Sequence, residues 1–541
     1  MLLPNTADYP RSDYAKAKSE KSIVEFKGLN LLPVCGSGEF SGMRNLSSRS
    51  YPCLSPRPPR GIYARGLEGA AAFTIVGSSG KAAYVLNSEL FYDEVSRGSL
   101  GAAFADCKRQ LLEFQDRLLI WPDRMYYDIS DDTLGTLYAS VSLSAPSFAA
   151  SVEDGALNDS VKYSAIGANS PITAFSAGDA VTVSGCSTAA NNITAPIDHI
   201  SSDNKTLYFA ENSFTDTAEG GIVTVARNVP DMEHICVANN RVWGCKGSSI
   251  YASKLGSAEN WNYFTLSPGG APSSVSSYAV DFTTPGDFTG CHRYGAYLAF
   301  FKEDCIHKLL GTKPSNYQRS DIVCPGLGLE RGSGKSMAYL AGELCYKSRL
   351  GIVAFAGGVP TLISAKLGER WSCSSAASDG RRYYVSARGG GGHSLLCYDS
   401  FYRLWHREDE LQVTDFAQSG GRLYMLSADG TVYINEDESA GEIVSWSGTL
   451  GEFAELSAEK KIQSRLRLRV ELPASSTLKL EYSADGGDWV TAYSGSGAMR
   501  QSFYISIAPT RCDSFTLRLS GSGDCKIYQI DRVFSRSTDA E

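Results

Sequence analysis

The sequence predicts an all-β protein: a β-propeller of six or seven blades, with a small β domain inserted in it and a β-sandwich after it. Apolar and polar residues alternate with a period of two, which is the period of strands rather than helices. A hairpin-like pattern recurs at intervals of 39 to 55 residues. Glycine is frequent (53 of 541 residues) and charged residues are few (20%), which favours many turns between buried strands.

Residues 1–60 are predicted to form an N-terminal arm. Residues 1–22 are polar and rich in Tyr, Lys and Ser, which indicates an extended segment. The segment 50–60 (SYPCLSPRPPR) holds four prolines and favours an extended polyproline or irregular conformation, because proline cannot continue a helix. The first propeller blades are expected in residues 61–144, with an early hairpin in 81–94.

Three segments carry the repeat most clearly, and they align without gaps and end in glycine. They are 241–256 (RVWGCKGSSIYASKLG), 296–311 (AYLAFFKEDCIHKLLG) and 343–358 (ELCYKSRLGIVAFAGG). Looser copies begin at Arg117, Arg382 and Arg422. A four-stranded propeller blade takes about 40–50 residues, and the repeat spacing agrees with that. Residues 229–455 are therefore expected to hold the remaining blades; unrelated hairpins in a sandwich are the alternative.

Two regions interrupt this spacing. Between Arg117 and Arg241 lie 124 residues, and the part from 145 to 228 is rich in Ser, Ala and Asn with alternating stretches of its own. We expect a small β domain there, inserted in a blade loop, because insertions are tolerated where their two ends lie close together. Residues 456–541 hold six alternating segments and predict a C-terminal β-sandwich.

The predicted sandwich begins with a strand in which Arg465, Arg467 and Arg469 alternate with apolar residues. This pattern is typical of a strand with one solvated and one buried face. A basic strip that contacts a partner is the alternative interpretation of the same three arginines.

Charge and cysteine usage exclude several classes of protein. The net charge of −8 (51 basic, 59 acidic residues) argues against a sequence-independent nucleic-acid binder, which needs a basic face. The 14 cysteines are scattered singly without a CxxC pair, and the six histidines lack zinc-type spacing. Cysteines such as Cys245, Cys345 and Cys397 fit small buried hydrophobes. The sequence shows no apolar run long enough to span a bilayer and no visible secretory signal. We therefore expect this protein to fold in a reducing cytosol.

The segment 326–336 (GLGLERGSGKS) resembles a phosphate-binding loop but does not match the complete pattern. Gly334-Lys335-Ser336 ends the Walker pattern, but Leu329 occupies the position of its first glycine. Arg331 likewise replaces the third glycine of the dinucleotide pattern.

Other motifs do not predict a catalytic site either. The segment 483–489 (SADGGDW) resembles the Asp-box turn of sialidases, with Trp489 one residue early, and favours a tight turn closed by an aromatic. His292 and His307 have the wrong spacing for a metal, and His406 follows a tryptophan at a blade edge. No Gly-x-Ser-x-Gly or HExxH motif occurs. The sequence therefore nominates no catalytic, cofactor-binding or metal-binding residues, and we expect a protein that is not an enzyme and has no cofactor.

Several segments resemble structural proteins of tailed bacteriophages and prophages. The first is 24–60 (VEFKGLNLLPVCGSGEFSGMRNLSSRSYPCLSPRPPR), where a "GLN" strand leads to an "NLS…YP.LSPR" segment. The others are 237–264 (VANNRVWGCKGSSIYASKLGSAENWNYF), 300–318 (FFKEDCIHKLLGTKPSNYQ), 381–387 (RRYYVSA), 395–409 (LLCYDSFYRLWHRED) and 420–433 (GGRLYMLSADGTVY). Together they cover most of the chain. They are similar to β-propeller proteins of the virion tail, namely hub, nozzle or packaged-DNA stabilisation proteins of short-tailed phages.

The resemblance implies a virion protein that is assembled in the bacterial host cytoplasm. The resemblance implies that the protein assembles with other copies of itself into a ring, typically of six subunits. Its other implied partners are the portal or adaptor and further tail proteins, and no association with a membrane is implied. DNA would pass during ejection without specific binding, which suits an acidic channel wall. Two alternatives stay open: a carbohydrate-binding or receptor-binding tail fibre or baseplate protein, and a host propeller scaffold that binds peptides.

Overall fold

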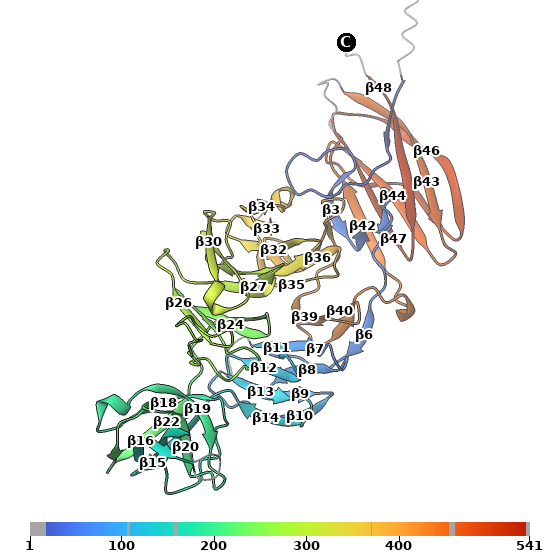
Figure 1. Cartoon of the computed structure of the whole chain (residues 1–541). Helices are drawn as coiled ribbons and strands as arrows, with labels where there is room; N and C mark the ends of the chain where they lie inside the picture. The colour runs from blue at the N-terminus through green and yellow to red at the C-terminus, as the bar shows by residue number, and fades with distance from the viewer. Residues whose placement is uncertain (1–17, 105–108, 155–160, 369, 454–459, 537–541) are drawn as a thin grey trace, which may run out of the picture.

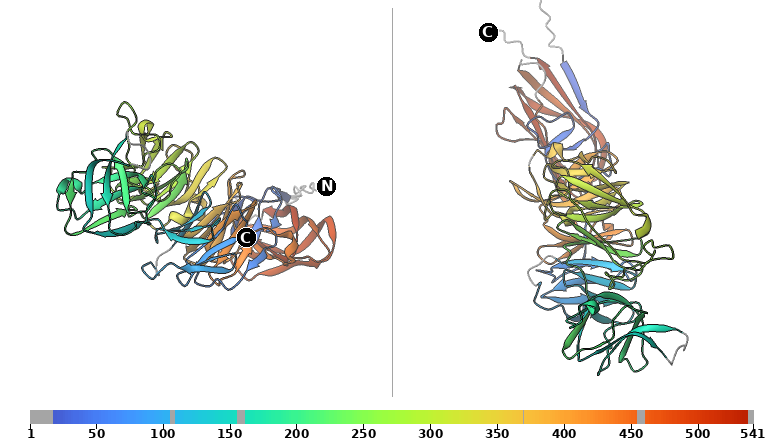
Figure 2. Two further views of the ribbon diagram at one scale, coloured as in Figure 1. Left: turned by 60° about the horizontal axis from the view of Figure 1, so that its bottom comes forward. Right: turned by 60° about the vertical axis from the view of Figure 1, so that its left-hand side comes forward.

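The computed structural model describes residues 18–104, 109–154, 161–368, 370–453 and 460–536. These residues form β-strands joined by turns, with short 3-10 helices at Ala189–Asn191 (η1), Pro314–Asn316 (η2), Gly334–Ser336 (η3), Ala365–Leu367 (η4) and Glu438–Ala440 (η5). The predicted all-β class is therefore confirmed. The molecule is elongated, with the inserted domain at one end, the propeller in the middle and the sandwich at the other end (Figure 1, Figure 2).

The middle part consists of seven consecutive four-stranded antiparallel sheets. The first three contain β7 (Ala72–Ile75), β8 (Ala82–Leu86), β9 (Glu89–Tyr92) and β10 (Val95–Ser99); β11 (Gln110–Phe114), β12 (Arg117–Trp121), β13 (Met125–Asp128) and β14 (Thr133–Thr136); and β23 (His234–Ala238), β24 (Arg241–Lys246), β25 (Ser249–Ala252) and β26 (Tyr278–Asp281). The next two contain β27 (Gly290–Tyr294), β28 (Tyr297–Phe301), β29 (Cys305–Leu310) and β30 (Gln318–Val323); and β31 (Ala338–Leu340), β32 (Glu343–Ser348), β33 (Gly351–Phe355) and β34 (Thr361–Leu362). The last two contain β35 (Ser372–Ser378), β36 (Arg382–Gly389), β37 (Gly392–Asp399) and β38 (Leu404–Arg407); and β39 (Val413–Ser419), β40 (Arg422–Ser427), β41 (Val432–Ile434) and β6 (Gly61–Ala64).

Packing between the sheets closes them into a ring. The first strands of most neighbouring sheets contact one another, including β39 of the last sheet with β7 of the first. An apolar cluster fills each space between consecutive sheets; Leu90 packs with Ile120 between the first two, and Tyr424 packs with Phe73 where the last meets the first. Each sheet is thus covered on both faces by its neighbours, which is the propeller arrangement.

The sequence repeat corresponds to the middle of each blade. The three gapless copies coincide with β24–β25, β28–β29 and β32–β33, the second and third strands of their blades. These central strands are buried on both faces; in β24, only Lys246 is exposed. Double-sided burial explains the low charge content, because a charged side chain there needs a partner.

The N-terminal side of the chain closes the last blade. β6 pairs with β41, so that a strand from the start of the chain forms the outer strand of a blade built from residues 413–434. Arg60, which directly precedes β6, is buried against Glu408 and Asp409.

The inserted domain is a single eight-stranded sheet around its own apolar core. Its first and last strands pair with each other, and Ala139 lies opposite Arg227, so the two ends of the insertion are adjacent. The strands are β15 (Ala139–Ser144), β16 (Ser147–Glu153), β17 (Lys162–Gly167), β18 (Ala180–Ser184), β19 (Thr194–Ile200), β20 (Thr206–Ala210), β21 (Thr217–Ala218) and β22 (Ile222–Arg227).

Two sheets make the C-terminal sandwich. One has the order β1-β48-β43-β46 and the other β2-β3-β42-β47-β44-β45. The strands are β1 (Lys18–Ile23), β2 (Gly28–Leu29), β3 (Glu39–Arg44), β42 (Ser445–Leu450), β43 (Lys461–Leu472), β44 (Thr477–Ala484), β45 (Val490–Ser496), β46 (Met499–Cys512), β47 (Phe515–Ser522) and β48 (Lys526–Arg536). A two-stranded sheet of β4 (Leu46–Ser47) and β5 (Ser55–Pro56) completes the fold.

Six strands fall outside the ranges that the sequence predicts for their domains. The predicted arm supplies β1, β2 and β3 to the sandwich, and β42 joins the sandwich although 229–455 is predicted as propeller. β6 belongs to the last blade rather than the first, and β15 to the inserted domain rather than to the blades of 61–144. The reason is that alternation identifies a strand but carries no information on its pairing partner.

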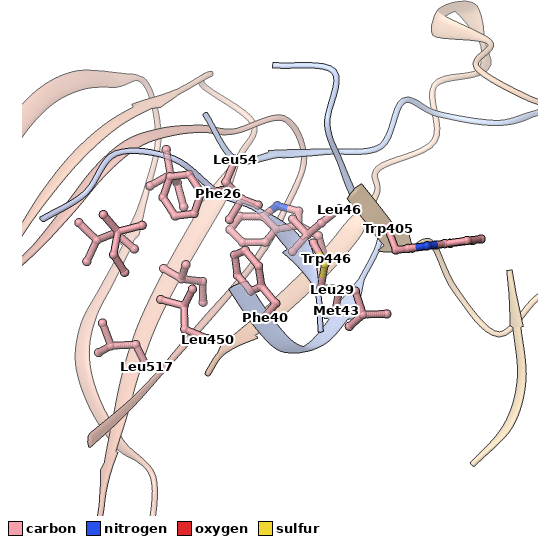
Figure 3. Packing of buried hydrophobic residues seen from close by; sticks show 14 of the residues in the cluster. Phe26, Leu29, Phe40, Met43, Leu46, Leu54, Trp405, Trp446, Leu450 and Leu517 are labelled. Atoms are coloured by element: carbon pink, nitrogen blue, oxygen red, sulfur yellow. The ribbon is translucent and has the colours of Figure 1, made fainter. Parts of the chain in front are cut away.

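The arm joins the sandwich to the propeller through a shared apolar core, which we call the junction core (Figure 3). Arm residues Phe26, Leu29, Phe40, Met43, Leu46 and Leu54 pack there with Trp446, Leu450 and Leu517 of the sandwich and Trp405 of the propeller. Gly28 has φ +79°, and a Cβ at this position would lie 2.4 Å from the carbonyl oxygen of Trp405. Only glycine permits this close approach of the arm to the sixth blade.

Each cysteine within the described residues is a free thiol, and most are buried. In the same residues, no helix is long and apolar enough to cross a bilayer.

Candidate functional site in the axial cavity

A cavity of about 750 Å³ lies on the propeller axis. Its walls come from β7, β11, β23, β27 and β39, the first strands of five blades, and from the turn before β31. Because the first strands contact one another around the ring, residues on them face the axis. The polar lining residues include Gln110, Glu233, His234, His292, Arg293, Lys335 and Asp415, and the apolar ones include Leu112, Met337 and Phe416.

An ion pair links two sides of the cavity. Lys335, in η3, lies 2.7 Å from a carboxylate oxygen of Asp415 on β39, two blades further along the chain. The same carboxylate accepts the backbone N–H of Phe73 at 3.1 Å. Asp415 therefore has its negative charge matched by a lysine and a backbone donor, and it is poorly placed to act as a general acid or base.

Two histidines supply neutral hydrogen-bonding groups. Burial lowers the pKa of His234, with Glu233 opposing this effect and Arg331 adding to it. Burial also lowers the pKa of His292, whose Nδ1 lies 2.6 Å from the carbonyl oxygen of Arg293. Nδ1 must donate there, which leaves Nε2 of the neutral ring as an acceptor. The cavity thus combines neutral hydrogen-bonding groups with charged side chains of both signs, and two ion pairs, Lys335–Asp415 and Lys246–Asp231, lie among them. Such a lining suits a polar ligand.

The described residues contain no group of three or more His, Cys, Asp or Glu side chains that could hold a metal ion. The Gly334-Lys335-Ser336 segment forms η3, a single turn before β31, where the Ser336 hydroxyl donates to Ser333 and accepts from the backbone of Lys347. These contacts bind the loop to its own blade and do not form a phosphate cradle.

The Asp-box-like segment is a tight turn in the sandwich. Asp485 and Gly486 have positive φ, and the Ser483 hydroxyl donates to the carbonyl of Gly487 at 2.6 Å. The ring of Trp489 lies against the guanidinium of Arg518, whose carbon is 4.2 Å from the ring centre.

Sequence reasoning missed a hydrogen-bonded Thr–His–Asp chain on the fourth blade. His307 Nδ1 lies 2.6 Å from Asp321 on the adjacent strand, and Nε2 lies 2.9 Å from the Thr284 hydroxyl. Burial lowers the pKa of His307 although Asp321 opposes it, and burial raises the pKa of the neighbouring Cys305 thiol. The His307 side chain is 1% exposed and lies outside the axial cavity. We therefore interpret the three hydrogen-bonded residues as structural: they attach the 282–289 loop to its blade. The available sequence signal was the position of His307 and Asp321 on consecutive strand-like segments, because consecutive strands usually lie side by side.

We expect the Lys335–Asp415 pair to contribute about 1 kcal/mol of coupling energy. Both side chains are partly buried (26% and 17% exposed), so solvent screens their attraction less than at an open surface. A double-mutant cycle with Lys335→Met and Asp415→Asn, followed by urea unfolding, measures this energy. The matched control is Lys246–Asp231 at the same cavity, which is 46% and 71% exposed and should couple by less than about 0.5 kcal/mol. Equal coupling in the two pairs would contradict the expectation.

No protein-family model and no curated protein sequence matches this chain. Solved structures with a similar fold include BamB from Moraxella catarrhalis (12% identity, 72% of this chain and 98% of that chain, TM-score 0.31). The phage phi92 endosialidase matches at 9% identity over 77% of this chain and 76% of its own, with a TM-score of 0.25. An exo-β-1,3-galactanase from Phanerochaete chrysosporium matches at 11% identity over 55% and 95%, with a TM-score of 0.22. At this level, none of these likenesses transfers an activity to the chain.

Proposed function

We propose that this chain is a structural subunit of a bacteriophage tail, of the hub or nozzle type, which forms a ring of six copies around the path of the ejected DNA. Its further partners are the portal or adaptor and other tail proteins. The resemblance of six segments to tail propeller proteins, including 24–60 and 237–264, is the sequence support for this proposal.

The junction core is the structural observation that carries the proposal. The segment 24–60 does not extend from the molecule: its apolar residues fill the space between propeller and sandwich. Its "GLN" residues all have structural roles, since Gly28 lies against Trp405, Leu29 is buried, and Asn30 donates to Glu39 at 2.7 Å. A stiff subunit with different domains at its two ends can hold neighbours at fixed positions, as a tail ring requires.

The charge of the chain agrees with this role. A wall along a DNA path should not retain phosphates, and a net charge of −8 supplies no general attraction for them. A ring lumen dominated by lysine and arginine would argue against the proposal.

Electron microscopy of the purified full-length chain, alone and in intact particles, tests the proposal. We expect rings with six-fold symmetry, located on the tail axis in particles. A monomer that binds or cleaves glycans would instead support the alternative function as a carbohydrate-binding tail fibre protein. The axial cavity favours that alternative, because its volume and its hydrogen-bonding lining suit a short oligosaccharide.

A further inference from the structure

The sandwich has a long open edge at β46. This strand borders the sheet β1-β48-β43-β46, and its only strand partner among the described residues is β43. In the described part of the chain, no backbone group of 499–506 bonds to anything on the other side of the strand. A bulge and Pro509 disrupt the later part of the strand, but 499–506 contains neither proline nor lysine, the usual protections of an edge.

Beside this edge, the outer face of the sheet carries alternating arginines and a tyrosine. Leu466, Leu468 and Val470 are buried, so the arginines between them project outward. The guanidinium carbons of Arg465 and Arg467 lie 5.1 and 5.8 Å from the ring centre of Tyr504 on β46, which is 58% exposed. The sequence pattern of one solvated and one buried face is thus present, and its exposed side chains are mainly basic. Arg467 also lies 3.7 Å from the buried Asp531 of β48. Arg465 and Arg469 are therefore the more available arginines of β43.

A hollow of about 310 Å³ lies at the same border. Arg469, Arg500, Gln501, Ser502 and Tyr528 are among its lining residues. Within 465–472 and 499–506 the charged residues are four arginines and Glu471. Glu471 already accepts a hydrogen bond from Tyr528 at 2.6 Å and lies 3.6 Å from Arg500. The guanidinium carbon of Arg469 lies 5.5 Å from the ring centre of Tyr528. Arg469 and Arg500 are therefore the two positively charged residues of the hollow.

We propose that β46 binds an acidic β-strand of another protein by strand addition. The backbone of the incoming strand pairs with 499–506, and its outward acidic side chains contact Arg500, the hollow and the arginines of β43. Backbone pairing supplies the affinity and the charged face supplies the selectivity, as in other cases of β-augmentation. A nucleic acid could contact the arginines with its phosphates but could not form backbone hydrogen bonds with the strand edge. The open edge therefore favours a polypeptide partner.

The complementary strand is not one of the described edge strands of this chain. Each of these carries at most one acidic residue; β1 has Glu20 next to Lys21, β30 has Asp321, and β45 has none. The acidic strand that fits this edge is therefore sought in a different polypeptide, and the inference does not depend on the proposed tail function.

Fluorescence anisotropy with a labelled eight-residue peptide, in which Glu alternates with Val or Thr, tests the proposal on the full chain. We expect binding that weakens at least tenfold in the Arg469→Glu/Arg500→Glu variant and when Lys replaces Glu in the peptide. The matched control is Arg65→Glu/Arg388→Glu, which reverses two exposed arginines of the propeller and should leave binding unchanged.

Two N-methylated forms of the peptide separate strand addition from charge attraction. Methyl groups on one edge of the peptide should abolish binding, and methyl groups on the other edge should preserve it. Equal binding of both forms would overturn the proposal. It would also be overturned if a 20-base-pair DNA duplex bound with the same arginine dependence and the peptide did not bind.

Discussion

Replacing Arg60 with methionine is expected to lower the free energy of unfolding by about 3–5 kcal/mol, because it removes the closest cation from two buried carboxylates. Among the described residues, Arg57 remains near them, 3.8 Å from Asp409. The side chains of Arg60, Glu408 and Asp409 are 6%, 7% and 16% exposed. Burial raises the pKa of Glu408, and Arg60 only partly offsets this effect. Burial would also raise the pKa of Asp409, but there the attraction and hydrogen bonds of Arg60 prevail and the pKa is lowered.

The loss should be concentrated at the closure of the ring. Arg60 directly precedes β6, which supplies the outer strand of the last blade. Hydrogen exchange should therefore show faster exchange in β6 and β41 than in the inserted domain, and urea unfolding gives the total effect.

Arg44→Met is the matched control for this experiment. Arg44 pairs with Glu410 at 3.1 Å, but both side chains are about half exposed, so its loss should cost less than about 1 kcal/mol. Adding Glu408→Gln to Arg60→Met should recover part of the stability, because it removes one unpaired charge. Equal losses for Arg60→Met and Arg44→Met would show that the buried network does not hold the closing strand.

Acidification should destabilise the sixth blade through His406. This side chain is 2% exposed on β38, and burial lowers its pKa to about 3, with Asp399 opposing the shift and Arg382 adding to it. In the unfolded chain the imidazole titrates near pH 6.5. Between these two values the unfolded state binds a proton that the folded state does not, so stability falls as the pH drops below about 6.5.

The expected contribution is about 1.4 kcal/mol per pH unit, or about 2 kcal/mol at pH 5. Urea unfolding of the protein and of His406→Gln at pH 7 and pH 5 measures it: the variant should lose about 2 kcal/mol less between the two values. The same substitution at the half-buried His393 of that blade controls for the loss of an imidazole as such. Parallel losses in the protein and in His406→Gln would contradict the prediction.

Local pattern was enough to predict the blades. A strand buried on both faces needs a short continuous apolar run, and segments such as 241–246 and 343–348 show that run together with the turn after it. The open edge of β46 and the axial cavity were not predictable in the same way. Each depends on which strands lie next to each other, as when Lys335 before β31 reaches Asp415 on β39.

By itself, the sequence determined the all-β class, the repeat of propeller blades, the inserted domain and the alternating faces of the sandwich strands, because these follow from side-chain period and spacing. The tertiary structure alone decided that β6 closes the last blade, that the arm fills the junction core and that His406 is buried. Such features depend on pairing between residues hundreds of positions apart, as for Phe40 and Leu450. Backbone N–H and C=O groups are the same in nearly every residue, so they do not specify which strands pair. The pairing is decided by which arrangement of strands buries all the apolar faces together.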